Sequence, residues 1–291
     1  MLLLMLELGM PIDCVLTADT GMEFPEMYRH WDKIDQLLYR ERGIHLTILR
    51  HPKGFEWFMF DQPKEKLKTL EKRAKLGVTP YGNGWPGIKV RWCTGQLKNH
   101  LIVKEVNRLK REKNALHYVG IAADEPDRIK DAIYPLYEWN ITEAEALWLC
   151  YNRGFDWNGL YEIYHRCSCW CCPFQRLGEL RTLRHHHPEL WERLRELDER
   201  AIGQFGHTPL GRFKDNWTVE QLEHRFAIED EARKEAIMAQ DKDKELRDMF
   251  KGVPPKNVII AVDDLPPKTL EQHLKDRQKG QKKPQKRKKG R

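Results

Sequence analysis

Four cysteines stand within six residues, in the segment Cys167-Ser-Cys169-Trp-Cys171-Cys172-Pro173. Thiolates are preferred ligands of zinc and of iron–sulfur clusters. Cys169 and Cys172 have the C-x-x-C spacing that directs two sulfur atoms at one metal. The 291-residue chain has only seven cysteines, too few for a secreted disulfide scaffold. The segment therefore indicates a metal centre in a reducing compartment.

A tetrahedral site or a cubane cluster takes four ligands, so the C-x-x-C pair needs partners. Cys93 is the expected third ligand, because it begins a helix and has Arg91 and Lys98 as cationic neighbours. Either Cys167 or Cys171 would complete the set. Three interpretations stay open: an iron–sulfur cluster, which we favour, a structural zinc on the same ligands, or cysteines without a metal. The two remaining cysteines lie in apolar segments and are expected in the core: Cys14 and Cys150.

The positive charge of the chain is concentrated at its end. The formal net charge is +7, but residues 275–291 contain ten Lys or Arg and one Asp, so residues 1–274 carry −2. We expect residues 263–291 to be a disordered basic tail, and 275–291 either contact nucleic-acid phosphates without sequence preference or only solubilise the chain. The chain shows no run of about 18 apolar residues and no signal peptide, so we expect a cytoplasmic protein without a membrane partner.

Apolar β-branched runs alternate with amphipathic stretches in the first half of the chain. The strands are expected at residues 12–19, 45–49 and 115–123. The helices are expected at residues 24–42, 96–113, 177–200 and 218–240. This alternation predicts an α/β fold over residues 1–150, with a Rossmann-like, doubly wound, mostly parallel sheet. A mostly helical region that contains the cysteine cluster should follow over residues 151–262.

Two local signals bear on the ends of helices. The apolar residues 2–8 are expected to end a helix at Gly9, and no capping residue precedes them. A doubly wound fold normally begins with a strand, and here the first strand is absent. Further on, Thr142 and Glu145 have the spacing of a capping box, which predicts a helix that ends at Gly154.

Four short motifs follow one another along the chain. They are Asp19-Thr20-Gly21-Met22-Glu23-Phe24-Pro25-Glu26, Arg91-Trp92-Cys93-Thr94-x-x-Leu97-Lys98, Gly120-Ile121-x-Ala123-Asp124-Glu125-x-x-Arg128 and Tyr134-Pro135-Leu136-x-x-Trp139. In this order they resemble the phosphoadenosine phosphosulfate reductase family of the PP-loop (adenine nucleotide alpha-hydrolase) superfamily. The cysteine segment is similar to that of a bacterial and phage subgroup. The resemblance covers roughly residues 1–200.

The resemblance implies an adenine nucleotide at the carboxyl ends of the strands, where open α/β sheets place ligands on general grounds. The nucleotide-binding residues that it implies are Asp19, Thr20 and Gly21 beside the nucleotide, and Arg91, Lys98 and Arg128 facing its sulfate or phosphate groups. Cys93 and the later C-x-x-C match the positions where relatives hold a [4Fe-4S] cluster. Those relatives have a Cys-Cys pair at the first position, whereas Thr94 follows Cys93 here.

The function implied by the resemblance is an enzyme of sulfur metabolism. It would use phosphoadenosine phosphosulfate, or ATP, in sulfonucleotide reduction or sulfur transfer, with a thioredoxin-like protein as reductant. The chain lacks the family's Ser-Gly-Gly-Lys-Asp-Ser phosphate loop and its C-terminal Glu-Cys-Gly-x-His motif, and no catalytic residue is assigned. We expect either a start assigned at an internal Met or a degenerate member.

Two alternative functions stay open. The first is an ATP-dependent sulfurtransferase that modifies nucleic acid, like the DNA phosphorothioation enzymes of the same superfamily. The second is a noncatalytic, metal-stabilised module that binds nucleic acid. The basic tail would serve either of them.

Overall fold

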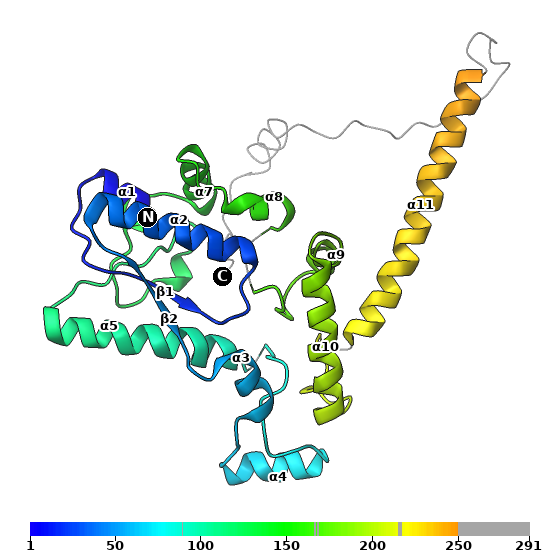
Figure 1. Cartoon of the computed structure of the whole chain (residues 1–291), viewed down its shortest axis with the longest axis horizontal. Coiled ribbons are helices and arrows are strands. Elements are labelled where there is room, and N and C mark those ends of the chain that lie inside the picture. Colours follow the sequence, from blue (N-terminus) through cyan, green and yellow to red (C-terminus); the bar gives the residue numbers. More distant parts are fainter. Residues whose placement is uncertain (89, 166, 168, 215–216, 250–291) are drawn as a thin grey trace, which may run out of the picture. The chain divides into compact units, whose positions relative to one another are not determined.

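A computed structural model describes residues 1–88, 90–165, 167, 169–214 and 217–249. The chain divides into two units after residue 232, and residues 1–232 form the first, compact one. The first unit is α/β, with many helices and a small parallel sheet (Figure 1). Of the helices in the described residues, none is long and apolar enough to cross a membrane. The predicted tail at 263–291 lies outside the described residues.

The sheet and the helices around it begin the chain. Their order is α1 (Leu2–Glu7), β1 (Val15–Asp19), α2 (Pro25–Arg42), β2 (Leu46–Arg50), α3 (Gly54–Glu56), the π-helical turn η1 (Trp57–Asp61) and α4 (Leu67–Lys75). Strands β1 and β2 are parallel, with Asp19 directly opposite Arg50 at their carboxyl ends. Parallel strands need a crossover connection, which α2 provides. Loops that follow the two strands therefore leave the same edge of the sheet.

The helix predicted at residues 24–42 is confirmed as α2. Pro25 stands in its first turn, where a fixed φ and the missing N–H group suit a helix start. Gly43 ends the helix in the left-handed conformation, with φ 66°. The apolar stripe between these two residues buries Trp31 and Leu38. Local signals and burial thus agree along the whole helix.

The middle of the chain adds helices to the unit. Their order is the π-helical turn η2 (Thr94–Asn99), α5 (His100–Lys113), η3 (Pro126–Arg128), α6 (Pro135–Glu138), α7 (Glu143–Asn152), η4 (Trp157–Gly159) and α8 (Leu160–Ile163). Helix α7 confirms the predicted capping box. The Thr142 hydroxyl accepts a hydrogen bond from the backbone N–H of Glu145, and the Glu145 carboxylate accepts one from the N–H of Thr142.

The strand predicted at residues 115–123 is wrong. In its place the segment makes one isolated parallel bridge, between Tyr118 and Ile133. A strand needs a partner of similar length, and here the partner becomes helix α6 at Pro135, which has no backbone N–H to extend a ladder. Within the described residues the sheet therefore contains two strands, β1 and β2.

The predicted helix at 177–200 is two helices, α9 (Leu177–His186) and α10 (Pro188–Phe205). The break falls before Pro188, because proline cannot donate the N–H bond that a continuous helix requires but is well suited to a first turn. His187, at the junction, is buried. The helix predicted at 218–240 is confirmed within α11 (Val219–Met249).

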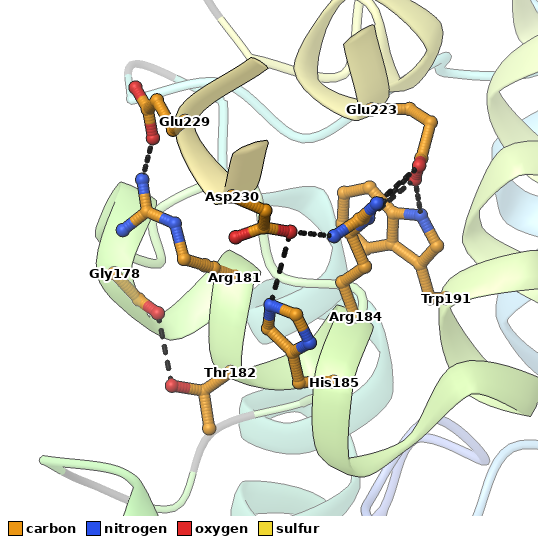
Figure 2. A network of polar contacts seen from close by, with 9 residues as sticks. All are labelled: Gly178, Arg181, Thr182, Arg184, His185, Trp191, Glu223, Glu229 and Asp230. Atoms are coloured by element: carbon orange, nitrogen blue, oxygen red, sulfur yellow. Dashed lines mark hydrogen bonds and ion pairs between the residues drawn. The ribbon is translucent and has the colours of Figure 1, made fainter. Parts of the chain in front are cut away.

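A network of ion pairs joins α9 to the beginning of α11 (Figure 2). Arg184 donates to both carboxylate oxygens of Glu223 at 2.8–3.0 Å and to Asp230 at 2.5 Å. The indole N–H of Trp191 also donates to Glu223, at 2.6 Å. Arg181 pairs with Glu229 one turn away. Bidentate arginine–carboxylate pairs fix geometry as well as charge, so they set the orientation of α9 and the first turns of α11.

Residues on both sides of the predicted boundary at residue 150 share one hydrophobic core. The ring of Phe24 lies 4.8 Å from that of Tyr164 and 5.1 Å from that of His187, measured between centroids. Phe60 stacks on Phe205 at 6.5 Å. The cysteine segment enters the same core through Trp170. The loop after β1 and the cysteine segment are therefore parts of one packed body, and the boundary at 150 stays a prediction.

A buried carboxylate lies under the start of α11. Asp198 is 2% exposed and accepts hydrogen bonds from the indole N–H of Trp85 at 2.9 Å and from the backbone N–H of Val219 at 2.6 Å. Burial is the main cause that raises the pKa of Asp198 to about 6, although these two hydrogen bonds act in the opposite direction. The folded state thus holds a proton on Asp198 at a pH where the unfolded chain has lost it.

We expect Asp198→Asn to remove a pH dependence of stability. Because the folded pKa lies above the unfolded one, the wild type binds more protons when folded, and its stability falls as the pH rises from about 4 through 6. A shift of about two pKa units corresponds to about 3 kcal/mol. Urea unfolding at pH 4 and pH 7 measures the free energy of unfolding of both proteins. From pH 4 to pH 7 this free energy should fall by up to about 3 kcal/mol more in the wild type than in the variant. A pH-independent difference would contradict the prediction, and Asp131→Asn, at an exposed position, is the control.

Candidate functional site

The loop that leaves β1 is organised by the buried carboxylate of Asp19. One oxygen accepts hydrogen bonds from the N–H of Gly21 at 2.6 Å and from the hydroxyl of Tyr28 at 3.0 Å. The other oxygen pairs with the guanidinium of Arg50, at the end of β2. A buried carboxylate is stable only when it is paired and hydrogen-bonded. Gly21 has φ 78°, so the turn itself uses a conformation that favours glycine.

A second buried carboxylate, Glu23, lies four residues further on. Its Oε1 atom accepts a hydrogen bond from the Thr20 hydroxyl at 3.0 Å and pairs with the Lys98 ammonium at 3.1 Å. Lys98 is on η2, a π-helical turn that leads directly into α5. Burial lowers the pKa of Lys98, but the interactions of its ammonium group with Cys169 and Glu23 outweigh burial, so the pKa lies above its ordinary value. Lys98 is therefore a positive charge at this site.

The cysteine segment meets the same loop. The backbone N–H of Trp170 donates to the carbonyl of Met22 at 3.1 Å. The sulfur of Cys169 lies 3.5 Å from the Thr20 hydroxyl and 3.6 Å from Oε1 of Glu23. Almost 150 residues of sequence separate these partners. The strand end, the π-helical turn and the cysteine segment thus converge on one small volume.

The C-x-x-C segment is a hydrogen-bonded turn. The N–H of Cys172 donates to the carbonyl of Cys169 at 3.1 Å, and the side-chain amide of Gln175 donates to the same carbonyl at 3.0 Å. Gln175 is buried, and its own N–H donates to the Cys172 carbonyl at 3.1 Å. Both ends of the turn are therefore fixed by the backbone and by Gln175, independently of any metal.

Four thiols of the predicted set influence one another. Burial raises the pKa of Cys93, of Cys171 and of Cys169, the last to about 12. Beyond burial, Cys172 raises the pKa of Cys93 and of Cys169, and Cys171 is affected by the other three. These electrostatic effects require proximity, so the four thiols lie near one another.

Cys167 has different surroundings. Its pKa is raised to about 12, chiefly by burial, and its partners are the Tyr161 hydroxyl and the charges of Glu23 and Glu26. Cys171, unlike Cys167, is thus affected by Cys93, Cys169 and Cys172 together. Cys14 is exposed, so its expected place in the core is wrong, because Cys14 precedes β1 rather than lying within it.

The four thiols are suitable metal ligands by their chemistry, but they are not arranged around a common metal position. Sulfur donors gathered in a buried place, with the cation Lys98 beside them, match what zinc or an iron–sulfur cluster requires. Within the described residues, no group of three or more His, Cys, Asp or Glu side chains already has the arrangement of a metal site. The predicted ligand set, Cys93, Cys169 and Cys172 with either Cys167 or Cys171, therefore stays a prediction.

Two of the predicted anion-binding residues, Arg91 and Arg128, are exposed and contact neither Glu23 nor Asp19 in an ion pair among the described residues. Arg91 is exposed, and its guanidinium lies 4.6 Å from the centre of the Phe174 ring. Arg128 is exposed and pairs with Glu125, three residues before it. The four sequence motifs contain neither Tyr28 nor Arg50, although both side chains contact Asp19. Arg50 ends β2, so its position directly opposite Asp19 follows from the strand register alone.

Comparisons with known proteins give one distant relative. An uncharacterized protein of Methanocaldococcus jannaschii is 27% identical over 213 residues, which cover 66% of this chain and 38% of that protein. The chain thus spans well under half the length of this relative. No family model and no solved structure matches the chain.

We expect Asp19→Asn to destabilise the protein. An asparagine side chain has one acceptor oxygen in place of two, and its NH₂ group would face either the donors of Gly21 and Tyr28 or the guanidinium of Arg50. A buried group left without its partner costs about 1–3 kcal/mol. Urea unfolding measures the loss, with Asp13→Asn at an exposed position as the matched control. Equal stability of Asp19→Asn and the wild type would show that this carboxylate does not organise the loop.

Proposed function

We propose that the protein is a phosphoadenosine phosphosulfate reductase-like enzyme that acts on an adenine nucleotide in sulfonucleotide reduction or sulfur transfer. The observation that carries the proposal is the convergence of the Asp19–Glu23 loop, Lys98 and the cysteine segment where β1 ends. Carboxyl ends of parallel strands are the usual place of ligands in open α/β sheets. The β1–α2–β2 unit also supports a Rossmann-like fold as the finer description of the sheet.

The chain offers two kinds of group to a sulfonucleotide at this place. Lys98 and Arg50 supply positive charge for sulfate or phosphate oxygens, and Arg91 and Arg128 are the further cations that the family resemblance implies. The Thr20 hydroxyl and the N–H groups of Gly21 and Met22 are hydrogen-bonded within the loop, so they would fix its shape beside the nucleotide. Lys98 already pairs with Glu23, so a bound anion would share this cation with the carboxylate.

Cys93, Cys169 and Cys172 would hold a metal centre, with Cys171 as the fourth ligand. When bound, an iron–sulfur cluster supplies a centre that can accept or donate an electron, whereas zinc would only fix the segment in place. Metal binding would deprotonate these thiols, and Lys98 would offset part of the resulting negative charge. We assign no catalytic residue.

The reaction is tested by supplying substrates anaerobically. With phosphoadenosine phosphosulfate and reduced thioredoxin, the proposed enzyme should release adenosine 3′,5′-bisphosphate. Release of AMP or pyrophosphate from ATP only in the presence of nucleic acid would instead establish the nucleic-acid sulfurtransferase. If protein that carries its metal catalyses neither reaction, the enzymatic proposal is wrong and a binding module is favoured.

We expect Lys98→Gln to weaken nucleotide binding. A hydrogen bond to a charged group contributes about 1.5–3 kcal/mol, so the dissociation constant should rise by about 10- to 100-fold. Isothermal titration with phosphoadenosine phosphosulfate and with ATP measures it. Lys68→Gln, an exposed lysine on α4, is the control of equal charge change. If both variants bind as the wild type does, the nucleotide is not held at Lys98.

The metal ligands are tested by composition. Anaerobically purified protein should contain iron and acid-labile sulfide, and we expect Cys93→Ala, Cys169→Ala and Cys172→Ala each to lose most of both. Cys171→Ala should lose more metal than Cys167→Ala, because Cys167 lies against Tyr161 instead. Cys14→Ala, at an exposed site, is the control. Zinc in place of iron would support the structural alternative, and full metal content in all variants would refute the ligand set.

A further inference from the structure

The outward face of α5 carries a row of polar and basic side chains. His100, Lys104, Asn107 and Arg111 follow one another at intervals of four, three and four residues, and all four are exposed. At 3.6 residues per turn this spacing places them in one line along the helix. Eleven residues at a rise of 1.5 Å make the row about 16 Å long. The opposite face of α5 buries Val106 and packs toward β1 and β2.

One histidine and one lysine lie beside the beginning of this row, and the histidine is an uncharged hydrogen-bonding group at neutral pH. His51, in the turn after β2, has its pKa lowered chiefly by burial and further by the positive charges of His100 and Lys53, so these three groups are neighbours. The Lys53 ammonium lies 5.4 Å from the centre of the Trp57 ring. An open hollow of about 350 Å³ is lined by Asn99, His100, Val103 and Lys104. The row therefore begins beside an open hollow that has His100 and Lys104 at its edge.

The acidic residues of α5 do not cancel its positive charge, because residues 100–113 contain five Lys or Arg and two Glu. Glu105 and Glu112 both pair with Arg108, on the flank of the helix. Among the described residues, no ion pair involves Lys104 or Arg111, and the Nε of Arg111 donates only to the carbonyl of Asn107 at 3.3 Å. On α10, by contrast, exposed arginines are paired, for example Arg200 with Asp61. The cations of the row are thus available to an external anion.

We propose that this surface, formed by His51, Lys53, His100, Lys104 and Arg111 and here called the basic face, binds the phosphate backbone of a nucleic acid. A row about 16 Å long is longer than one phosphate group, so it suits a polymer that presents several phosphates in line. Arginine and lysine contacts to the backbone provide affinity without reading sequence. None of the residues of the basic face belongs to 275–291, the predicted tail, or to the thiols of the candidate site.

The proposal goes beyond the nucleotide reaction and has its own readout. Fluorescence anisotropy of labelled single-stranded and duplex oligonucleotides, with the full-length chain at several salt concentrations, gives the affinity and its salt dependence. We expect Lys104→Gln/Arg111→Gln to bind more weakly. Loss of two phosphate contacts should make the slope of log K against log salt shallower by about 1.4 for a single strand or 1.8 for a duplex.

The matched control is Lys68→Gln/Lys72→Gln, which removes two exposed cations from α4 and leaves the basic face intact. Both variants keep the tail, so tail binding is the same in each. The control should keep the wild-type slope. An equal loss in both variants would show that only net charge matters, and an unchanged slope in Lys104→Gln/Arg111→Gln would show that the basic face is not used; either result overturns the proposal. Binding to anionic lipid vesicles but not to oligonucleotides would also overturn it.

Discussion

One carboxylate oxygen holds the candidate site together. Oε1 of Glu23 contacts the Thr20 hydroxyl, the Lys98 ammonium and the Cys169 sulfur, which belong to three separate parts of the chain. Glu23 is buried, and a carboxylate removed from water is tolerated only when such partners compensate for its lost hydration. The loop after β1, η2 and the cysteine segment therefore depend on one another, because together they surround the buried carboxylate of Glu23 with partners.

The rest of the unit supports this arrangement from two sides. On one side, Asp19 and Arg50 join the carboxyl ends of β1 and β2, so the loop begins from a fixed strand pair. On the other side, Phe24 packs against Tyr164 and His187, and Trp170 enters the same core. Large aromatic residues of the core thus pack around the loop that follows β1.

Sequence reasoning succeeded where a local signal and burial agree. The apolar stripe of residues 24–42 predicted α2, which begins at Pro25 and ends before Gly43, and the Thr142 capping box predicted α7. It failed where a distant partner decides, as for residues 115–123, whose β-branched composition suits a strand but whose neighbour turns into a helix at Pro135. Glu23 stood within a recognised motif, yet its three partners come from tertiary contacts that spacing does not reveal.

Net charge predicts little about where this protein can bind an anion. Residues 1–274 sum to −2, which alone would argue against any basic surface. Many of their carboxylates, however, pair with nearby arginines. Glu105 and Glu112 pair with Arg108, and Glu223 and Asp230 pair with Arg184 (Figure 2). Because distant charges are screened, a face is basic where cations outnumber the carboxylates close to them. On α5 those cations stand in a line, and an overall acidic body thereby presents a basic face.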